Sequence, residues 1–257
     1  VPSGPYTVVD FHYAGGVMNV MKMLESKLYT NVPSMYGNTW SDMLSKVKAQ
    51  ENKVIHSLEK PLFHEPGLKI LRGNLSPNGA IVRPTAVYDE VKYMKGKAKV
   101  FEGDRPAFEA IMAGEIVPGD IIVIRYEGCK GAPGMKELML SIDALIGLGL
   151  DKSVGLISDA RFSGFNYGAI IGHVSPEAYD GGNIALVENG DEIVIDIPNG
   201  EVSMLVSEEE LERRRAAWVC PPLKEEKGCL NIFAKMCRPA EEGGAMQPWD
   251  LNAKFKR

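Results

Sequence analysis

The first part of the chain has apolar residues at the spacing of an amphipathic helix. The residues on one such face are Val17, Val20, Met21, Leu24 and Leu28. A second run with this spacing covers residues 39–51, and prolines at 61 and 66 then interrupt the pattern. We therefore expect a helical segment over residues 1–60 and a separate domain over residues 61–257.

Beyond residue 69 the pattern changes to short apolar runs rich in β-branched residues, which is typical of strands. The predicted strands cover residues 80–83, 98–101, 121–126, 154–158, 184–187, 192–197 and 202–206. Two turn sequences, Asn189-Gly190 and Pro198-Asn199-Gly200, predict hairpins between the last three strands.

Helical spacing recurs between these strands, over residues 106–113, 135–148 and 207–218. Ser207 and Glu210 form the pattern of a capping box at the start of the last helix. Ser175 followed by Pro176 predicts the start of a further short helix. This mixture predicts an α/β fold with a barrel-like sheet flanked by helices.

Composition narrows the choice of function. The chain has 257 residues, 45% of them hydrophobic, with 29 Lys+Arg against 34 Asp+Glu and a net charge of −5. This is globular composition, and the acidic balance makes nucleic acid an unexpected partner. No apolar run approaches the ~18 residues of a membrane span, so we expect no membrane association.

The cysteines and the first residues suggest where the protein works and how much of it is present. Four cysteines contain no C-x-x-C pair, so we expect unpaired thiols and a cytoplasmic location. The chain begins Val-Pro-Ser-Gly-Pro, from which we expect a fragment or a processed product.

Two loops carry candidate chemistry. The first, residues 127–135, follows an apolar strand and begins with Glu127; the second, residues 158–168, follows another and contains Ser163. If the two strands are parallel neighbours, Glu127 and Ser163 can border one pocket. Glycine-rich strand–helix turns are also common without any catalytic role, and Ser163 lacks the G-x-S-x-G pattern of a hydrolase nucleophile.

These loops and their surroundings resemble the dihydroxy-acid dehydratase / phosphogluconate dehydratase family. The matching strings are IRYEGCKGAPGM at 124–135, SDARFSG at 158–164 and GHVSPEA at 172–178, supported by AGGV at 14–17 and RGNLSPNGA at 72–80. They occur in the expected order, but family members are much longer. The chain resembles the end of the N-terminal domain followed by the C-terminal domain, which in this family is similar to the swivelling β-barrel domain of aconitase-like proteins.

The resemblance implies a hydro-lyase that removes water from a 2,3-dihydroxy acid to give a 2-keto acid. It implies that Ser163 takes the C2 proton, that Glu127 binds Mg²⁺, and that Gly164, Arg161 and Ser76 contact the substrate. It also implies an iron–sulfur cluster, whose cysteine ligands lie outside this chain. We therefore expect the N-terminal half of the same enzyme as partner, a homo-oligomer, and no turnover by the isolated chain.

Departures from the family pattern bear on the substrate. Cys129 stands where proline is usual, Ala132 where glycine is usual, and Ala160 replaces a glycine common in the branched-chain members. The form around Ala160 resembles sugar-acid dehydratases, so an aldonic acid is favoured over a branched-chain dihydroxy acid. Two alternatives stay open: a non-catalytic partner or regulatory subunit that keeps the domain for assembly, and an anion- or phosphate-binding module using residues 128–134.

Overall fold

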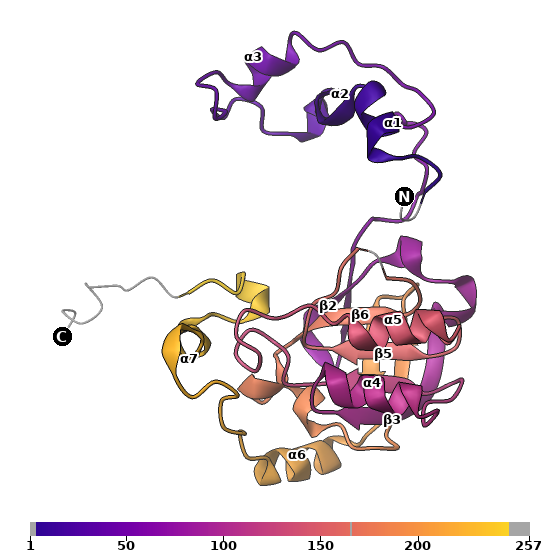
Figure 1. Cartoon of the computed structure of the whole chain (residues 1–257), viewed down its shortest axis with the longest axis vertical. Coiled ribbons are helices and arrows are strands. Elements are labelled where there is room, and N and C mark those ends of the chain that lie inside the picture. The colour runs from indigo at the N-terminus through magenta and orange to yellow at the C-terminus, as the bar shows by residue number, and fades with distance from the viewer. Residues whose placement is uncertain (1–3, 165, 247–257) are drawn as a thin grey trace, which may run out of the picture. The chain divides into compact units, whose positions relative to one another are not determined.

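The computed structural model describes residues 4–164 and 166–246, so Phe165 of the second candidate loop lies outside the described residues. The chain forms two compact units, with the boundary between Glu65 and Pro66 (Figure 1). Each unit is described by itself below.

The first unit is helical. Its helices are α1 (Val8–Tyr13), α2 (Gly16–Met23), the 3₁₀ helix η1 (Glu25–Lys27) and α3 (Trp40–Leu44). Helix α3 covers only the beginning of the predicted 39–51 helix, because Ser45 directs its hydroxyl to the Asp42 carbonyl, 2.7 Å away, where the helix ends. The buried Asn19 joins distant parts of the unit by donating to the carbonyls of Ala14 (3.0 Å) and Gln50 (2.7 Å).

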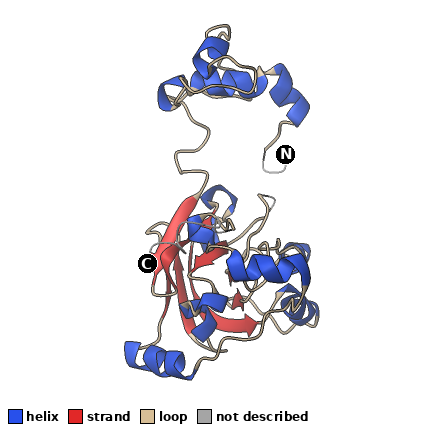
Figure 2. Ribbon diagram, turned by 90° about the vertical axis from the view of Figure 1, so that its left-hand side faces the viewer, coloured by secondary structure: helices blue, strands red, loops and turns tan. Residues whose placement is uncertain are grey.

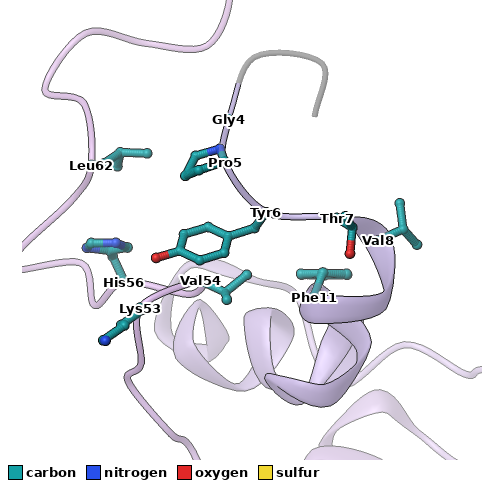
Figure 3. A pocket seen from close by; sticks show the side chains of 10 residues that line it. All are labelled: Gly4, Pro5, Tyr6, Thr7, Val8, Phe11, Lys53, Val54, His56 and Leu62. Carbon is teal, nitrogen blue, oxygen red and sulfur yellow. The ribbon is translucent and has the colours of Figure 1, made fainter.

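This unit contains a pocket of about 580 Å³. Its lining is mostly apolar, with Tyr6, Phe11, Val54 and Leu62. Figure 3 shows the Tyr6 ring extending into the pocket with its hydroxyl directed toward His56.

The second unit is built on a closed barrel of eight strands in the order β1-β2-β6-β5-β4-β3-β7-β8. The strands are β1 (Lys69–Gly73), β2 (Ser76–Val82), β3 (Tyr93–Phe101), β4 (Ile121–Ile124), β5 (Gly155–Ser158), β6 (Ile170–Ser175), β7 (Glu192–Asp196) and β8 (Glu201–Met204). Strands β3, β4, β5 and β6 pair in parallel, and β7 and β8 form an antiparallel hairpin. The predicted α/β fold with a barrel-like sheet is therefore confirmed.

Helices connect and flank the strands of the barrel (Figure 2). They are α4 (Asp104–Met112), α5 (Leu140–Gly147), α6 (Glu208–Ala217) and α7 (Gly228–Met236), with the 3₁₀ helices η2 (Pro84–Ala86), η3 (Asp89–Val91), η4 (Ala178–Asp180), η5 (Asn183–Leu186) and η6 (Ala240–Glu242). Helices α4 and α5 contact each other and lie side by side over the sheet (Figure 1).

Burial on both faces explains the continuous apolar run of β4. Ile121 and Val123 point into the barrel core, whereas Ile122 and Ile124 belong to a second core beneath α4 and α5. A strand covered on both sides needs no polar face, so its sequence shows no alternation. The loop after β4 therefore starts from a rigid, fully buried position.

Several predicted elements are wrong. Residues 184–187 belong largely to η5 rather than to a strand, because Ala185 donates to the Gly182 carbonyl (2.8 Å) in a turn. Asn189-Gly190 is consequently no hairpin turn between strands. Ser175 ends β6 instead of capping a helix, and the next 3₁₀ helix starts only at residue 178.

Other differences concern where elements begin. Helix α5 starts at Leu140, not at 135, and β1 and β6 are strands that the pattern missed. Strand β6 contains Gly172, which interrupts its apolar run; the Phe162 ring fills the space where a Cβ would lie. In α6, Ser207 accepts from the Glu210 amide as predicted, but the Glu210 carboxylate binds Arg213 and Arg214 instead of reaching back.

Two further findings concern thiols and membranes. All four cysteines are free, with Cys129 and Cys237 buried together and Cys220 and Cys229 exposed. Among residues 4–164 and 166–246, no helix combines the length and apolar character needed to cross a bilayer.

Candidate active site

The two candidate loops start side by side. Strands β4 and β5 are parallel neighbours, with Ile124 paired to Ser158 at their carboxyl ends. Strand β6 lies next to β5, and Gly79 in the middle of β2 pairs with Ser175 at the end of β6. Four segments therefore meet at one end of the barrel, which confirms the strand arrangement on which the shared-pocket prediction depends.

Asp159 joins three of these segments. Its fully buried carboxylate accepts hydrogen bonds from the backbone N–H groups of Tyr126 (3.2 Å), Glu127 (3.0 Å) and Ala178 (2.9 Å). Burial raises the pKa of Asp159 to about 6, although these three donors act to lower it. This side chain thus fixes where the polypeptide turns from β4 toward Glu127.

Glu177 supports the glycine-rich part of the first loop. Its carboxylate accepts from the N–H groups of Lys130 (3.0 Å) and Gly131 (3.3 Å). Burial, assisted by the nearby Asp159 charge, raises the pKa of Glu177 to about 7. A Cβ on Gly128 would overlap the Glu177 side chain, so any larger residue would force Glu177 to shift. Two backbone donors of the proposed anion-binding loop are therefore already bound to the protein's own carboxylate, which argues against that alternative.

Tyr126 turns the backbone sharply just before Glu127. Its φ of 62° lies in the left-handed region, which costs a non-glycine residue about 1 kcal/mol. Three side chains form hydrogen bonds with it: Asp159 accepts from its N–H, Lys224 donates to its carbonyl at 2.7 Å, and the Trp218 indole donates to its hydroxyl at 3.0 Å. Hydrogen bonds to the N–H, the carbonyl and the hydroxyl of Tyr126 therefore stabilise this turn.

Glu127 is a buried carboxylate, with 1% of its side chain exposed. Lys224 Nζ lies 3.0 Å from Oε1 and Lys136 Nζ lies 3.1 Å from Oε2. Within the described residues, Oε2 accepts no hydrogen bond. A buried carboxylate oxygen that accepts no hydrogen bond suits a hard cation such as Mg²⁺. Across the described ranges no cluster of three or more His, Cys, Asp or Glu side chains could hold a metal ion, so Glu127 would be one ligand of a set completed from elsewhere.

The remaining predicted site residues occupy different positions around this end of the barrel. Ser163 is exposed on the loop after β5. The next residue, Gly164, accepts a hydrogen bond from the Arg83 guanidinium, which also donates to the Asn166 carbonyl at 3.2 Å. A common pocket for Glu127 and Ser163 stays a prediction.

Arg161 and Ser76 have surroundings that the sequence does not reveal. Arg161 Nε donates to the Met135 carbonyl (2.7 Å), and its backbone carbonyl accepts from the Leu138 N–H (3.0 Å), so it joins the two loops. Ser76 is fully buried at the start of β2, and its Oγ has no hydrogen-bond partner in the described part of the chain. Substrate contact by Arg161, Gly164 and Ser76 stays a prediction.

Sequence reasoning missed four charged residues that shape the site. Asp159 and Glu177 stand in quoted motifs, and an acidic residue directly after a buried strand was an available signal for Asp159. Lys136 directly follows the first loop and carried no signal of its own. Lys224 lies 97 positions from Glu127 in the chain, and no local pattern indicates that contact.

The chain matches the family described as "Dihydroxy-acid/6-phosphogluconate dehydratase C-terminal" over residues 53–244. It belongs to this family. Among curated relatives, it is 45% identical to the dihydroxy-acid dehydratase of Clostridium novyi (strain NT) over 249 residues, covering 96% of this chain and 45% of the relative. The dihydroxy-acid dehydratase of Methanothrix thermoacetophila is also 45% identical, over 250 residues, with 96% and 46% covered.

A third relative, the dihydroxy-acid dehydratase of Methanosarcina barkeri (strain Fusaro / DSM 804), is 46% identical over 247 residues, covering 95% of this chain and 44% of that protein. The resemblance seen in the motifs is thus confirmed along nearly the whole chain. The chain spans slightly less than half the length of these dehydratases.

Proposed function

We propose that this chain is the C-terminal part of a hydro-lyase that converts a 2,3-dihydroxy acid to a 2-keto acid. The observation that carries the proposal is Glu127: a buried carboxylate at the carboxyl end of β4, beside the loop that bears Ser163, with one oxygen that meets only the ammonium of the half-exposed Lys136 in the described part of the chain. Membership of a dehydratase family indicates that the reaction at this carboxylate is the removal of water.

In the proposed reaction, the C2–H bond of the substrate breaks and its proton passes to Ser163 Oγ. The C3–OH bond then breaks, the hydroxyl leaves as water with the proton that Ser163 took from C2, and the resulting enol becomes the 2-keto acid. When bound, a divalent cation at Glu127 would supply charge stabilisation for the negative charge that develops next to the substrate carboxylate. Glu127 holds that position and Ser163 accepts the proton, which requires a strongly lowered serine pKa.

An iron–sulfur cluster assisting departure of the 3-hydroxyl would be bound outside this chain. A cluster needs thiolates, and burial raises the pKa of the Cys129 thiol to about 11, which disfavours that form. Cys220 and Cys229 are exposed and belong to different segments. We therefore propose that the N-terminal half of the same enzyme supplies the cluster.

Exposed apolar side chains on the first unit support contact with such a partner. Tyr13, Tyr29, Met35 and Tyr36 are all largely exposed, and an accumulation of exposed large apolar residues is typical of surfaces that bind protein. We propose that the N-terminal half covers them, in a cytoplasmic homo-oligomer. Co-expression of the two halves followed by size-exclusion chromatography tests whether they associate and in what oligomeric state.

Two observations bear on the identity of the substrate, and they favour different acids. The departures at Cys129, Ala132 and Ala160 favour an aldonic sugar acid, whereas the curated relatives are named dihydroxy-acid dehydratases. We retain the aldonic acid as first choice and a branched-chain dihydroxy acid as second. An assay of 2-keto acid formation from both classes decides between them.

The test of function pairs this chain with an N-terminal half and measures 2-keto acid formation. Ser163→Ala is expected to abolish turnover while substrate still binds, and Glu127→Gln to abolish Mg²⁺-dependent substrate binding and turnover with it. Ser203→Ala, on β8 and hydrogen-bonded to Glu201, is the matched control and should keep full activity. Full activity of Ser163→Ala would overturn the proposed role, and an assembled but inactive wild-type complex would favour a non-catalytic subunit.

A further inference from the structure

The two lysines at Glu127 differ in how they are held. Lys224 Nζ donates to two acceptors, the Tyr126 carbonyl at 2.7 Å and Glu127 Oε1 at 3.0 Å. Lys136 Nζ forms an ion pair with Oε2, at 3.1 Å, and that oxygen accepts no hydrogen bond within the described residues. The Lys136 side chain is also the more exposed of the two, 55% against 42%.

The two lysines also lie on segments that are attached differently to the Tyr126 turn. Lys224 lies on the segment between α6 and α7, which has a second contact with the same turn through Trp218 and the Tyr126 hydroxyl. Lys136 follows Met135, whose φ of 52° is left-handed, on an irregular stretch before α5. Lys224 is therefore attached to a segment that contacts the Tyr126 turn twice, whereas Lys136 stands on an irregular loop.

We propose that the two lysines divide the Glu127 carboxylate between them: Lys224 is a positioning residue that fixes Oε1, and Lys136 is an exchangeable counter-ion whose place at Oε2 a divalent cation takes. This inference rests on the proposed function, because it takes Glu127 as a cation ligand. It adds two residues, Lys136 and Lys224, that determine how tightly Glu127 binds the cation.

The physical argument is one of competition and orientation. An ammonium group is a compact, strongly hydrated point charge on a flexible stem, so Lys136 can leave Oε2 for water at little cost. Lys224 loses two hydrogen bonds if it leaves, and the left-handed turn at Tyr126 loses one of its supports. If both lysines acted only as positive charges, removing either would strengthen cation binding equally; the proposed division predicts different effects.

The test uses the ¹⁵N-labelled chain assembled with the N-terminal half, which would complete the ligand set, and Mn²⁺ alone as probe. Paramagnetic broadening of the Glu127 amide signal reports local binding, and the Mn²⁺ concentration for half-broadening is compared among variants. Lys136→Met should lower that concentration about three- to fivefold, the worth of an ion pair whose ammonium group is half exposed. Lys224→Met should not lower it, and Lys224→Arg should resemble the wild type. Lys227→Met, on an exposed position of the Lys224 segment, is the control.

A second measurement needs no cation. Hydrogen–deuterium exchange of a peptide covering residues 125–131 should become faster in Lys224→Met, and should be unchanged in Lys136→Met, Lys224→Arg and Lys227→Met. Unchanged signals from the opposite end of the barrel confirm that each variant is folded.

The outcomes separate the two proposals. Glu127-dependent broadening in which both Met variants tighten Mn²⁺ equally, or in which Lys136→Met has no effect, refutes the division of roles and leaves the cation site intact. Unchanged exchange in Lys224→Met refutes its positioning role. Broadening that survives Glu127→Gln, or no broadening in the wild type, refutes the cation site and this inference with it.

Discussion

Replacing Glu177 by glutamine tests how the site loop is supported. Glu177 is almost completely buried and accepts hydrogen bonds from the backbone of Lys130 and Gly131. The substitution keeps the shape of the side chain and removes its charge. It should therefore change how the stability of the second unit depends on pH.

The magnitude follows from the pKa of Glu177. Burial raises it from the ordinary 4.5 to about 7. The folded protein therefore keeps a proton that the unfolded chain releases, so this stabilising contribution is complete below pH 4.5 and is lost as pH rises through about 7. Linkage gives a loss of about 2 kcal/mol between pH 5.5 and 7.5 for the wild type, and Glu177→Gln lacks it.

A constant cost accompanies the substitution. The glutamine amide nitrogen cannot accept from a backbone N–H, so one hydrogen bond is lost, at about 0.5–1.5 kcal/mol. This cost does not vary with pH. Asp159, whose pKa is raised in the same direction, remains in both proteins, so the difference between them reports the charge of Glu177 together with its interaction with Asp159.

The assay is urea unfolding at pH 5.5 and 7.5, followed by Trp218 fluorescence in a background in which the other two tryptophans, Trp40 and Trp249, are replaced by phenylalanine. Relative to wild type, Glu177→Gln should gain about 2 kcal/mol on going to the higher pH. The exposed Glu115→Gln should follow the wild type at both pH values. If Glu177→Gln differs from wild type by the same amount at both pH values, the reasoning is refuted.

Two other substitutions test packing and buried charge. Gly128→Ala should lower the free energy of unfolding by about 1–3 kcal/mol, because its Cβ would meet Oε2 of Glu177. Gly147→Ala is the control and should not lower it, since its Cβ meets nothing within 4 Å. Equal melting temperatures for the two variants would contradict this account. Arg214→Ala should cost about 3 kcal/mol, since the side chain is only 10% exposed and pairs with Asp191 at 2.6 Å. Arg213→Ala, 66% exposed, should leave the melting temperature nearly unchanged; a comparable loss in both would show that burial of the pair is not what matters.

The sequence predicted the elements whose signals are local. Strand β4 is evident because both of its faces are buried and its four residues are all apolar. Helix α6 is evident because Ser207 caps it. Strand β6 was missed because Gly172 and a left-handed His173 interrupt its apolar pattern, and their place depends on Phe162 packing from another loop.

The candidate site divides in the same way. Its position after β4 and β5 was readable, since motif and strand are adjacent in sequence, and the structure bears out the parallel pairing. The sequence did not predict which charged side chains surround Glu127. Lys224 reaches it only because the segment after α6 returns to the Tyr126 turn.

The sequence alone thus determined the family, the fold class and the residues that open each loop, because these depend on motifs and on periodicity within a few residues. Only the tertiary structure decided which backbone N–H groups of the first loop are bound by Asp159 and Glu177, and which lysines pair with Glu127. The physical reason is that Asp159, Glu177 and Lys224 act through contacts 19 to 98 positions apart in the chain, and such contacts exist only once the barrel has closed.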